Sequence, residues 1–137
     1  MSIQGNKEIL YRFFQEVFNE GRMEVFDELV APEYTHHDDP CSNAHTAAEF
    51  RDWIAGSRGL VPDLSLTIGD TITEGDRVAV RGTGRGTHTR AFWGLPANGK
   101  KWQYGWVYVA RLKEDRIAEG WLNWDRMGLK LQIEGGA

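Results

Sequence analysis

Side chains able to bind metals or move protons gather in one short segment of the sequence, YTHHDDPCSNAH at residues 34–45. It holds three of the four histidines, the only cysteine and two adjacent aspartates. Such a set suits a metal site, one wall of an acid–base pocket, or a polar surface loop. A metal site needs three or four converging ligands. His36 and His37 would diverge on a strand, and Pro40 separates them from Cys41, so no metal site is predicted.

An acid–base pocket with His37 in its wall is the favoured interpretation. His88, from a distant segment, is a second candidate, because either imidazole could polarise a carbonyl group or donate a proton. The alternative for each is a histidine that is hydrogen-bonded at a strand end. Asp38 and Asp39 either orient a histidine or are solvated turn residues.

A carboxylate near the C-terminus, Asp125, is the candidate general base. Alternation along a strand places Trp121, Asn123 and Asp125 on one face. If that face lines an apolar cavity, Asp125 could remove a proton from a carbon beside a carbonyl. Trp121 would then shield the carboxylate from water, and Asn123 would donate a hydrogen bond. The alternative is that Asp125 caps a helical turn at DRMGL, because aspartate is a preferred N-cap residue.

Aromatic side chains supply the candidate binding surface. Trp102, Tyr104, Trp106 and Tyr108 alternate along one strand, with valines on its other face. They either stack on a planar ligand or form a subunit interface. Trp93, in the loop after His88, is interpreted as part of a lid. The predicted substrate-binding residues are Trp121, Asn123, Trp106, Tyr104, Trp93 and Phe14.

The first half of the chain is predicted to be helical. Apolar residues recur at helical spacing over 9–18, and NEG at 19–21 ends this helix. A second helix over 23–30 ends before Pro32. TAAE at 46–49 is a capping box that starts a third helix, and Gly56, Gly59 and Pro62 end it.

The second half is predicted to form strands, over 64–69, 77–88, 101–112 and 117–125, with a short strand at EYTHH and one C-terminal helical turn. Three glycines are expected to weaken or bulge the second of these strands. Helices followed by strands indicate an α+β fold and a single domain over residues 1–137. A curved antiparallel sheet covered by helices on its concave face leaves a conical pocket.

Composition narrows the classes of partner. The 137 residues are 41% hydrophobic and carry a formal charge of −4 without a basic tract, so no nucleic-acid partner is expected. The single cysteine, Cys41, excludes an internal disulfide and suits the cytoplasm; together with His45 it is assigned to a surface loop. The N-terminus has no long apolar run, so no signal peptide or membrane segment is predicted.

Four segments together resemble the SnoaL-like polyketide cyclases of the nuclear transport factor 2-like (ketosteroid isomerase-like) superfamily. They are YRFFQEVFNEGRMEVFDELVAPEYTHHD, VPDLSLTIGDTITEGDRVAVRGTGRGTHT, FWGLPANGKKW and WLNWDRMGLKLQ. The resemblance implies a cone-shaped sheet wrapped around three N-terminal helices. It implies that Asp125, in a Trp-Asp-Gly-Leu pattern, is the acid–base residue, and that His37 and His88 match the family's histidines.

The resemblance also implies the function: a cofactor-independent enzyme that closes a polyketide ring by an intramolecular aldol reaction. The expected ligand is a hydrophobic, polycyclic or aromatic small molecule, and the expected assembly is a homodimer. Two alternatives stay open. One is a non-catalytic small-molecule-binding domain of the same fold. The other is an epoxide hydrolase or isomerase relative, in which Asp125, Asn123 and an inward Arg81 or Arg85 would hold a water.

Overall fold

The computed structural model describes residues 3–37 and 44–135, so the predictions for Asp38, Asp39 and Cys41 lie outside the described residues. Helices come first and most strands follow, which confirms the α+β class. The elements are α1 (Ile3–Arg12), the π-helix η1 (Phe13–Asn19), α2 (Met23–Leu29), β1 (Val30–His37), α3 (Ala47–Leu60), β2 (Ser65–Glu74), β3 (Arg77–Thr87), β4 (Lys101–Lys113), β5 (Arg116–Trp124) and α4 (Arg126–Glu134).

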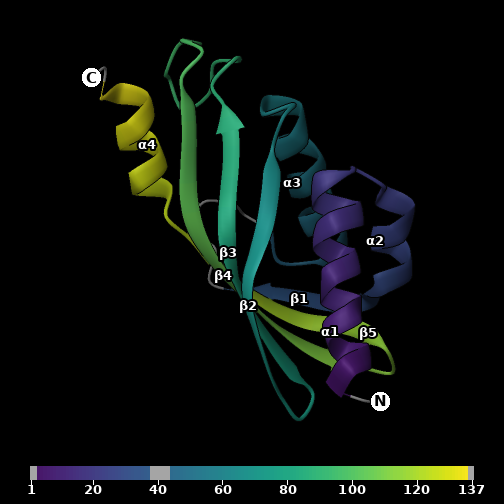
Figure 1. Cartoon of the computed structure of the whole chain (residues 1–137). Helices are drawn as coiled ribbons and strands as arrows, with labels where there is room; N and C mark the ends of the chain where they lie inside the picture. The colour runs from purple at the N-terminus through teal and green to yellow at the C-terminus, as the bar shows by residue number, and fades with distance from the viewer. Residues whose placement is uncertain (1–2, 38–43, 136–137) are drawn as a thin grey trace.

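The five strands form one curved, unclosed sheet in the order β1-β5-β4-β3-β2 (Figure 1). Neighbouring strands are antiparallel except β1, which runs parallel to β5. The four long strands are thus antiparallel as predicted, and β1 is the short strand for which the sequence predicted no direction. Its pairing with β5 is long-range, and local pattern carries no information on strand direction. In Figure 1 the helices α1 to α3 lie together on one side of the sheet, and α4 lies beside β4.

The capping box at the start of α3 is present as predicted. The Thr46 side chain accepts a hydrogen bond from the Glu49 amide at 3.2 Å, and the Glu49 carboxylate accepts one from the Thr46 amide at 3.1 Å. The helix then continues through Gly56 and Gly59 and ends two residues before Pro62. The predicted end between Gly59 and Pro62 is confirmed, but Gly56 does not stop the helix, because packing of the helix on the core outweighs the cost of about 1 kcal/mol per glycine.

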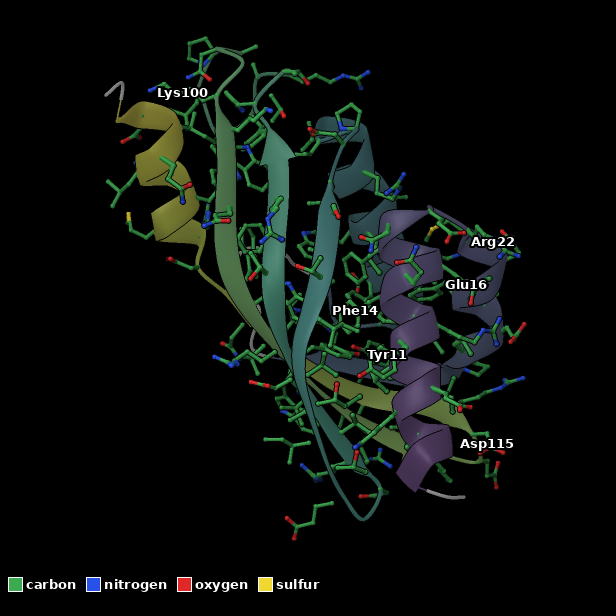
Figure 2. All side chains as sticks on the ribbon, viewed as in Figure 1. Tyr11, Phe14, Glu16, Arg22, Lys100 and Asp115 are labelled. Carbon is green, nitrogen blue, oxygen red and sulfur yellow. The ribbon has the colours of Figure 1, made fainter. Side chains whose placement is uncertain are left out.

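The helices fill the concave side of the sheet with aromatic rings. Figure 2 shows Tyr11 and Phe14 on the side of the first helical segment that faces β2, while Glu16 and Arg22 lie away from the sheet. The Phe14 ring packs on that of Trp106, with centroids 4.5 Å apart. Aromatic pairs of this kind add packing energy to the area they bury.

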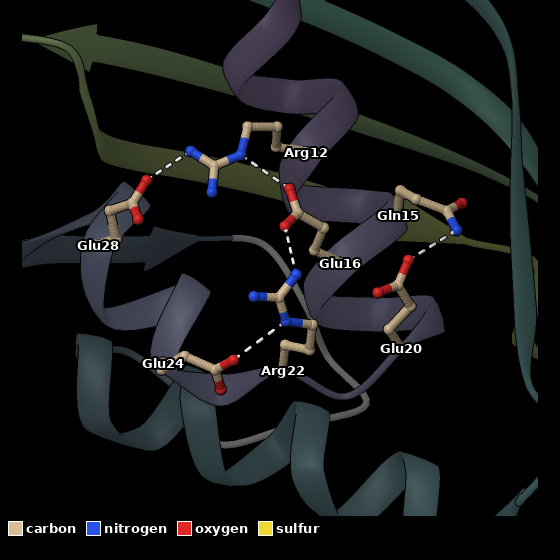
Figure 3. Close-up of polar contacts among 7 residues, drawn as sticks. All are labelled: Arg12, Gln15, Glu16, Glu20, Arg22, Glu24 and Glu28. Carbon is tan, nitrogen blue, oxygen red and sulfur yellow. Dashed lines mark hydrogen bonds and ion pairs between the residues drawn. The ribbon is translucent and has the colours of Figure 1, made fainter.

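A chain of alternating charges joins α1, η1 and α2 on the surface (Figure 3). Glu16 lies at its centre, 2.7 Å from Arg12 and 2.8 Å from Arg22. Arg12 continues the chain to Glu28, and Arg22 continues it to Glu24. Exposed pairs contribute little singly, but a network of several pairs can hold neighbouring helices together.

Three alternate glycines of β3 lie directly opposite three large aromatic residues of β4. The register pairs are Gly82 with Trp106, Gly84 with Tyr104 and Gly86 with Trp102. At each glycine an added Cβ would come within 2.4–2.6 Å of the opposing ring. The predicted bulge is therefore absent from the β3–β4 pairing. The glycines instead make room for the three aromatic rings. The one irregularity in β3 pairing is on its other side, between Ile68 and Asp70 of β2.

Candidate functional site

An apolar cavity of about 120 Å³ lies between α3, the start of β4, the end of β5, α4 and the loop that connects β3 to β4. Most of its wall is aromatic. The lining residues are Phe18, Trp53, Ser57, Leu60, Val61, Leu64, Phe92, Trp93, Trp102, Tyr104, Trp124 and Leu129. Leu60 is 45% exposed, so the cavity reaches the surface beside it. Of the predicted substrate-binding residues, Tyr104 and Trp93 are in this wall.

The polar groups of the wall are mostly hydrogen-bond donors. The indole nitrogens of Trp102 and Trp124 are buried and have no acceptor among the described residues. Burial raises the pKa of Tyr104 above its usual range, so this phenol stays protonated at physiological pH. The Ser57 hydroxyl is already used, because it donates to the Trp53 carbonyl at 2.9 Å. No carboxylate or histidine is among the residues that line the described cavity.

Asp125 lies next to Trp124 at the start of α4, where it is exposed and acts as the N-cap. Its Oδ1 accepts a hydrogen bond from the Gly128 amide at 2.8 Å. This geometry is the helix cap that the sequence analysis gave as the alternative to a general base. The prediction that Asp125 is buried by Trp121 is wrong. In the sequence, Asp125 lies between Trp124, which lines the cavity, and Arg126. The guanidinium of Arg126 lies over the ring of Trp93, another residue of the cavity wall.

His88 is fully buried and organises the loop after β3. Its Nε2 lies 3.0 Å from the Leu95 carbonyl, which can only accept, so this nitrogen carries the hydrogen. Nδ1 has no partner among the described residues. The ring packs edge-on against Phe92, a residue of the cavity wall. Its backbone carbonyl also accepts hydrogen bonds from the amides of residues 98 and 99. His88 thus supports the wall from behind.

His37 lies on the outer face of the sheet, away from the cavity. Its Nε2 is 2.6 Å from Glu119, whose other oxygen accepts from Arg111 at 2.8 Å. Arg111 first, and then His37, hold the pKa of Glu119 below its usual range. The His37 ring stacks on Trp121 at 5.0 Å. The expectation that His37 forms a pocket wall is therefore wrong about its position.

His36 is the histidine that points inward, as the neighbour of an outward His37 must. It is buried against Phe50, and its Nδ1 lies 2.7 Å from the Tyr34 hydroxyl. That hydroxyl lies 2.8 Å from the hydroxyl of Tyr108. The three side chains form a buried polar chain inside the core. His45, expected in a surface loop, is exposed.

The two faces of β5 are also reversed relative to the prediction. Leu122 is buried and Trp124 lines the cavity, whereas Asn123 is exposed and Trp121 packs against Arg77 on the outer face. Trp121 and Asn123 therefore do not line the cavity, contrary to the prediction. Phe14 and Trp106 face inward but belong to the core, not to the cavity wall.

The arrangement expected for a water-activating epoxide hydrolase is not assembled. Arg81 is exposed and forms an ion pair with Asp70. Arg85 is exposed and donates to the Thr67 hydroxyl at 2.8 Å. Neither guanidinium points inward, because alternation on β3 gives the inner face to the glycines, and Asn123 is exposed as well.

Gln132 of α4 was missed in the sequence analysis. Its side chain binds the backbone of β4 at Gln103, beyond the last residue of β4 that pairs with β5. Its side chain accepts from the Gln103 amide at 3.1 Å and donates to the Gln103 carbonyl at 2.7 Å. The carboxamide thus replaces a neighbouring strand. It holds α4 against the segment that carries Trp102 and Tyr104, two residues of the cavity wall. No local pattern in the sequence could mark this contact, because Gln103 and Gln132 lie 29 residues apart.

Within residues 3–37 and 44–135, no three His, Cys, Asp or Glu side chains are close enough to hold a metal ion together. No helix in this part of the chain is long and apolar enough to cross a membrane.

Comparison with known proteins gives one family. Residues 8–133 match the family model described as SnoaL-like polyketide cyclase. No curated protein matches the chain.

Structures of known proteins share the fold over nearly the whole chain. A candidate polyketide cyclase from Acidithiobacillus ferrooxidans has 30% sequence identity and a TM-score of 0.90, with 100% of both chains covered. TsrD from Streptomyces laurentii has 27% identity and a TM-score of 0.85, with 98% of both chains covered. IdmH, a candidate polyketide cyclase from Streptomyces antibioticus, has 26% identity and a TM-score of 0.86, with 93% of this chain and 97% of IdmH covered.

Proposed function

Because the chain belongs to the SnoaL-like polyketide cyclase family, we propose that it closes a ring in a polyketide-derived substrate by an intramolecular aldol reaction, without a cofactor. The observation that carries this proposal is the aromatic, donor-rich cavity, whose wall residue Trp124 directly precedes Asp125 in the chain. Two structural relatives are described as candidate polyketide cyclases, which supports the same reaction class.

In this reaction a base removes a proton from a carbon beside one carbonyl group. The resulting enolate carbon attacks the carbon of a second carbonyl, and the oxygen that becomes negative takes up a proton. Asp125 is the acid–base group of the proposal, because its second carboxylate oxygen is not needed for the cap on Gly128. Tyr104 and the indole N–H groups of Trp102 and Trp124 would stabilise the oxygen that gains charge.

Turnover of a linear substrate tests the proposal. A linear polyketide with several free carbonyl groups would be incubated with the purified protein, without added metal or cofactor. We expect a cyclised product that has the mass of the substrate, or that mass less one water, as measured by chromatography with mass spectrometry. Equal rates of cyclisation with and without the protein would contradict the proposal.

The second candidate function is a non-catalytic domain that binds a small molecule. It is favoured by one observation, the lack of any carboxylate or histidine in the wall of the described cavity. Binding without turnover in the same assay would select it.

We also propose that the protein is a homodimer that pairs through the outer face of the sheet. The aromatic residues of β4 face inward, but Val107 on the opposite face is 39% exposed. The same outer face carries Val109, and Trp121 of β5 lies opposite Val109. One core can cover only one face of a sheet. Light scattering at high micromolar concentration is expected to give twice the chain mass, and a monomer under these conditions would refute the proposal.

A further inference from the structure

The size of the cavity bears on the substrate class. A dry cavity of about 150 Å³ lined by apolar side chains is known to accept one benzene molecule. The cavity here measures about 120 Å³. Its space therefore corresponds to one aromatic ring, not to the polycyclic ligand expected from the sequence. A larger ligand must extend through the opening beside Leu60 or push part of the wall outward.

The chemistry of the wall bears on the same question. It offers ring faces, the buried indole N–H groups of Trp102 and Trp124 and the hydroxyl of Tyr104, and no charged side chain is among the lining residues. An indole N–H can only donate, so its partner must be an acceptor. A charged ligand would lose its hydration without gaining an ionic partner. The wall thus favours an uncharged aromatic ligand that carries carbonyl or hydroxyl oxygens.

Trp93 occupies a strained position in this wall. It is the first central residue of the turn Phe92–Leu95, closed by a hydrogen bond from the Leu95 amide to the Phe92 carbonyl at 2.9 Å. Its φ is 55° and that of Gly94 is 74°. A positive φ is ordinary for glycine but unfavourable for a bulky residue, and such strain persists only where the surroundings maintain it.

Trp93 is held by one residue of the cavity wall and by two residues outside it. Its ring stacks on Trp124 with centroids 6.0 Å apart, and the guanidinium of Arg126 lies 4.7 Å above it. The turn itself is anchored from behind, because His88 donates to the Leu95 carbonyl. The fold thus holds a large aromatic ring over the cavity, at a position where glycine would be the unstrained residue.

We propose that the cavity selects a single uncharged aromatic ring that bears acceptor oxygens, and that Trp93 sets this size limit. The inference deepens the proposed function, since it names the class of ring that the enzyme would form. It concerns binding alone, so it can fail or succeed independently of the aldol reaction.

The test compares four small probes by isothermal titration with the whole chain. Acetophenone has one ring and a carbonyl, 2-acetylnaphthalene has two rings, benzoate is charged, and ethylbenzene lacks an acceptor. We expect acetophenone to bind about tenfold or more tightly than 2-acetylnaphthalene, because overfilling a packed site costs at least that factor. Ethylbenzene is expected to bind about tenfold more weakly than acetophenone, for want of a hydrogen bond, and benzoate more weakly still.

The variant that tests the role of Trp93 is Trp93→Gly, which removes both the ring and the strain. It should bind 2-acetylnaphthalene about tenfold more tightly than the native chain does, with a smaller change for acetophenone. The matched control Trp93→Phe keeps an aromatic ring over the cavity and should keep the size limit. If Trp93→Gly does not fold, as judged by circular dichroism, Trp93→Asn replaces it, since asparagine tolerates a positive φ.

Four results would overturn the proposal: equal affinity of the native chain for the one-ring and two-ring ketones, tighter binding of benzoate than of acetophenone, an unchanged size limit in the variant that folds, or no binding of acetophenone. If the size limit holds but no cyclised product forms, only the proposed reaction is lost. If cyclisation occurs without the size limit, only this inference is lost.

Discussion

Asp125→Asn is expected to lower the rate of ring closure by about 100-fold or more, the range in which a positioned acid–base group acts. Asparagine keeps the size and the capping oxygen of Asp125 but cannot accept the substrate's proton. Since asparagine caps helices about as well as aspartate, the stability of the variant should stay within a few tenths of a kcal/mol, an estimate taken from measured caps. Turnover and the melting temperature, measured together, separate these effects.

The control for the capping role is Asp125→Ala. This change removes the hydrogen bond to the Gly128 amide as well as the carboxylate, and it should cost about 1 kcal/mol of stability. The two variants should therefore be similarly inactive but differ in stability. If both retain turnover within a few-fold of the native rate, Asp125 is a structural cap, and the binding-domain alternative becomes the better account.

Gly84→Ala is expected to destabilise the fold and deform the cavity, although it adds only one methyl group. The new Cβ would lie 2.4 Å from the Tyr104 ring, which is buried in the cavity wall. Overpacking of this kind costs about 1–3 kcal/mol. The affinity for a cavity ligand should also fall, because Tyr104 must move. Thermal unfolding followed by circular dichroism measures the first effect, and titration with acetophenone measures the second.

The chain provides a matched control for this change on the neighbouring strand. Gly105 of β4 is exposed, and no atom lies within 4 Å of an added Cβ. Gly105→Ala should therefore be neutral or slightly stabilising, because alanine restricts the unfolded chain more than glycine does. Equal losses of stability in the two variants would mean that the strand backbone, and not the space for Tyr104, requires glycine.

The sequence by itself determined the class of the fold and where several elements begin. The capping box at Thr46, the stop at Gly21 and the alternation along β4 are local signals, and each has the expected structure. Gly21 has a φ of 72°, which suits glycine alone at low cost. Such features depend on residues close in sequence, so they can be recognised without the fold.

Only the tertiary structure decided which face of β5 lines the cavity. The two-residue turn between β4 and β5 pairs Lys113 with Arg116, and the same register carried along the hairpin would pair Trp106 with Asn123. The predicted inward Asn123 and Trp121 correspond to that regular hairpin. In the structure the register shifts by one residue at Ala118, so that Trp106 pairs with Trp124 instead.

The physical reason is the β-bulge, which places one extra residue in β5. Side chains alternate with a period of two, so a shift of one residue exchanges the two faces of a strand. Trp124 thereby enters the cavity wall, and Trp121 moves to the outer face, where His37 stacks on it. Ile117 and Ala118 are both buried beside the bulge. Their burial depends on packing against distant elements, and for that reason the sequence alone could not locate the bulge.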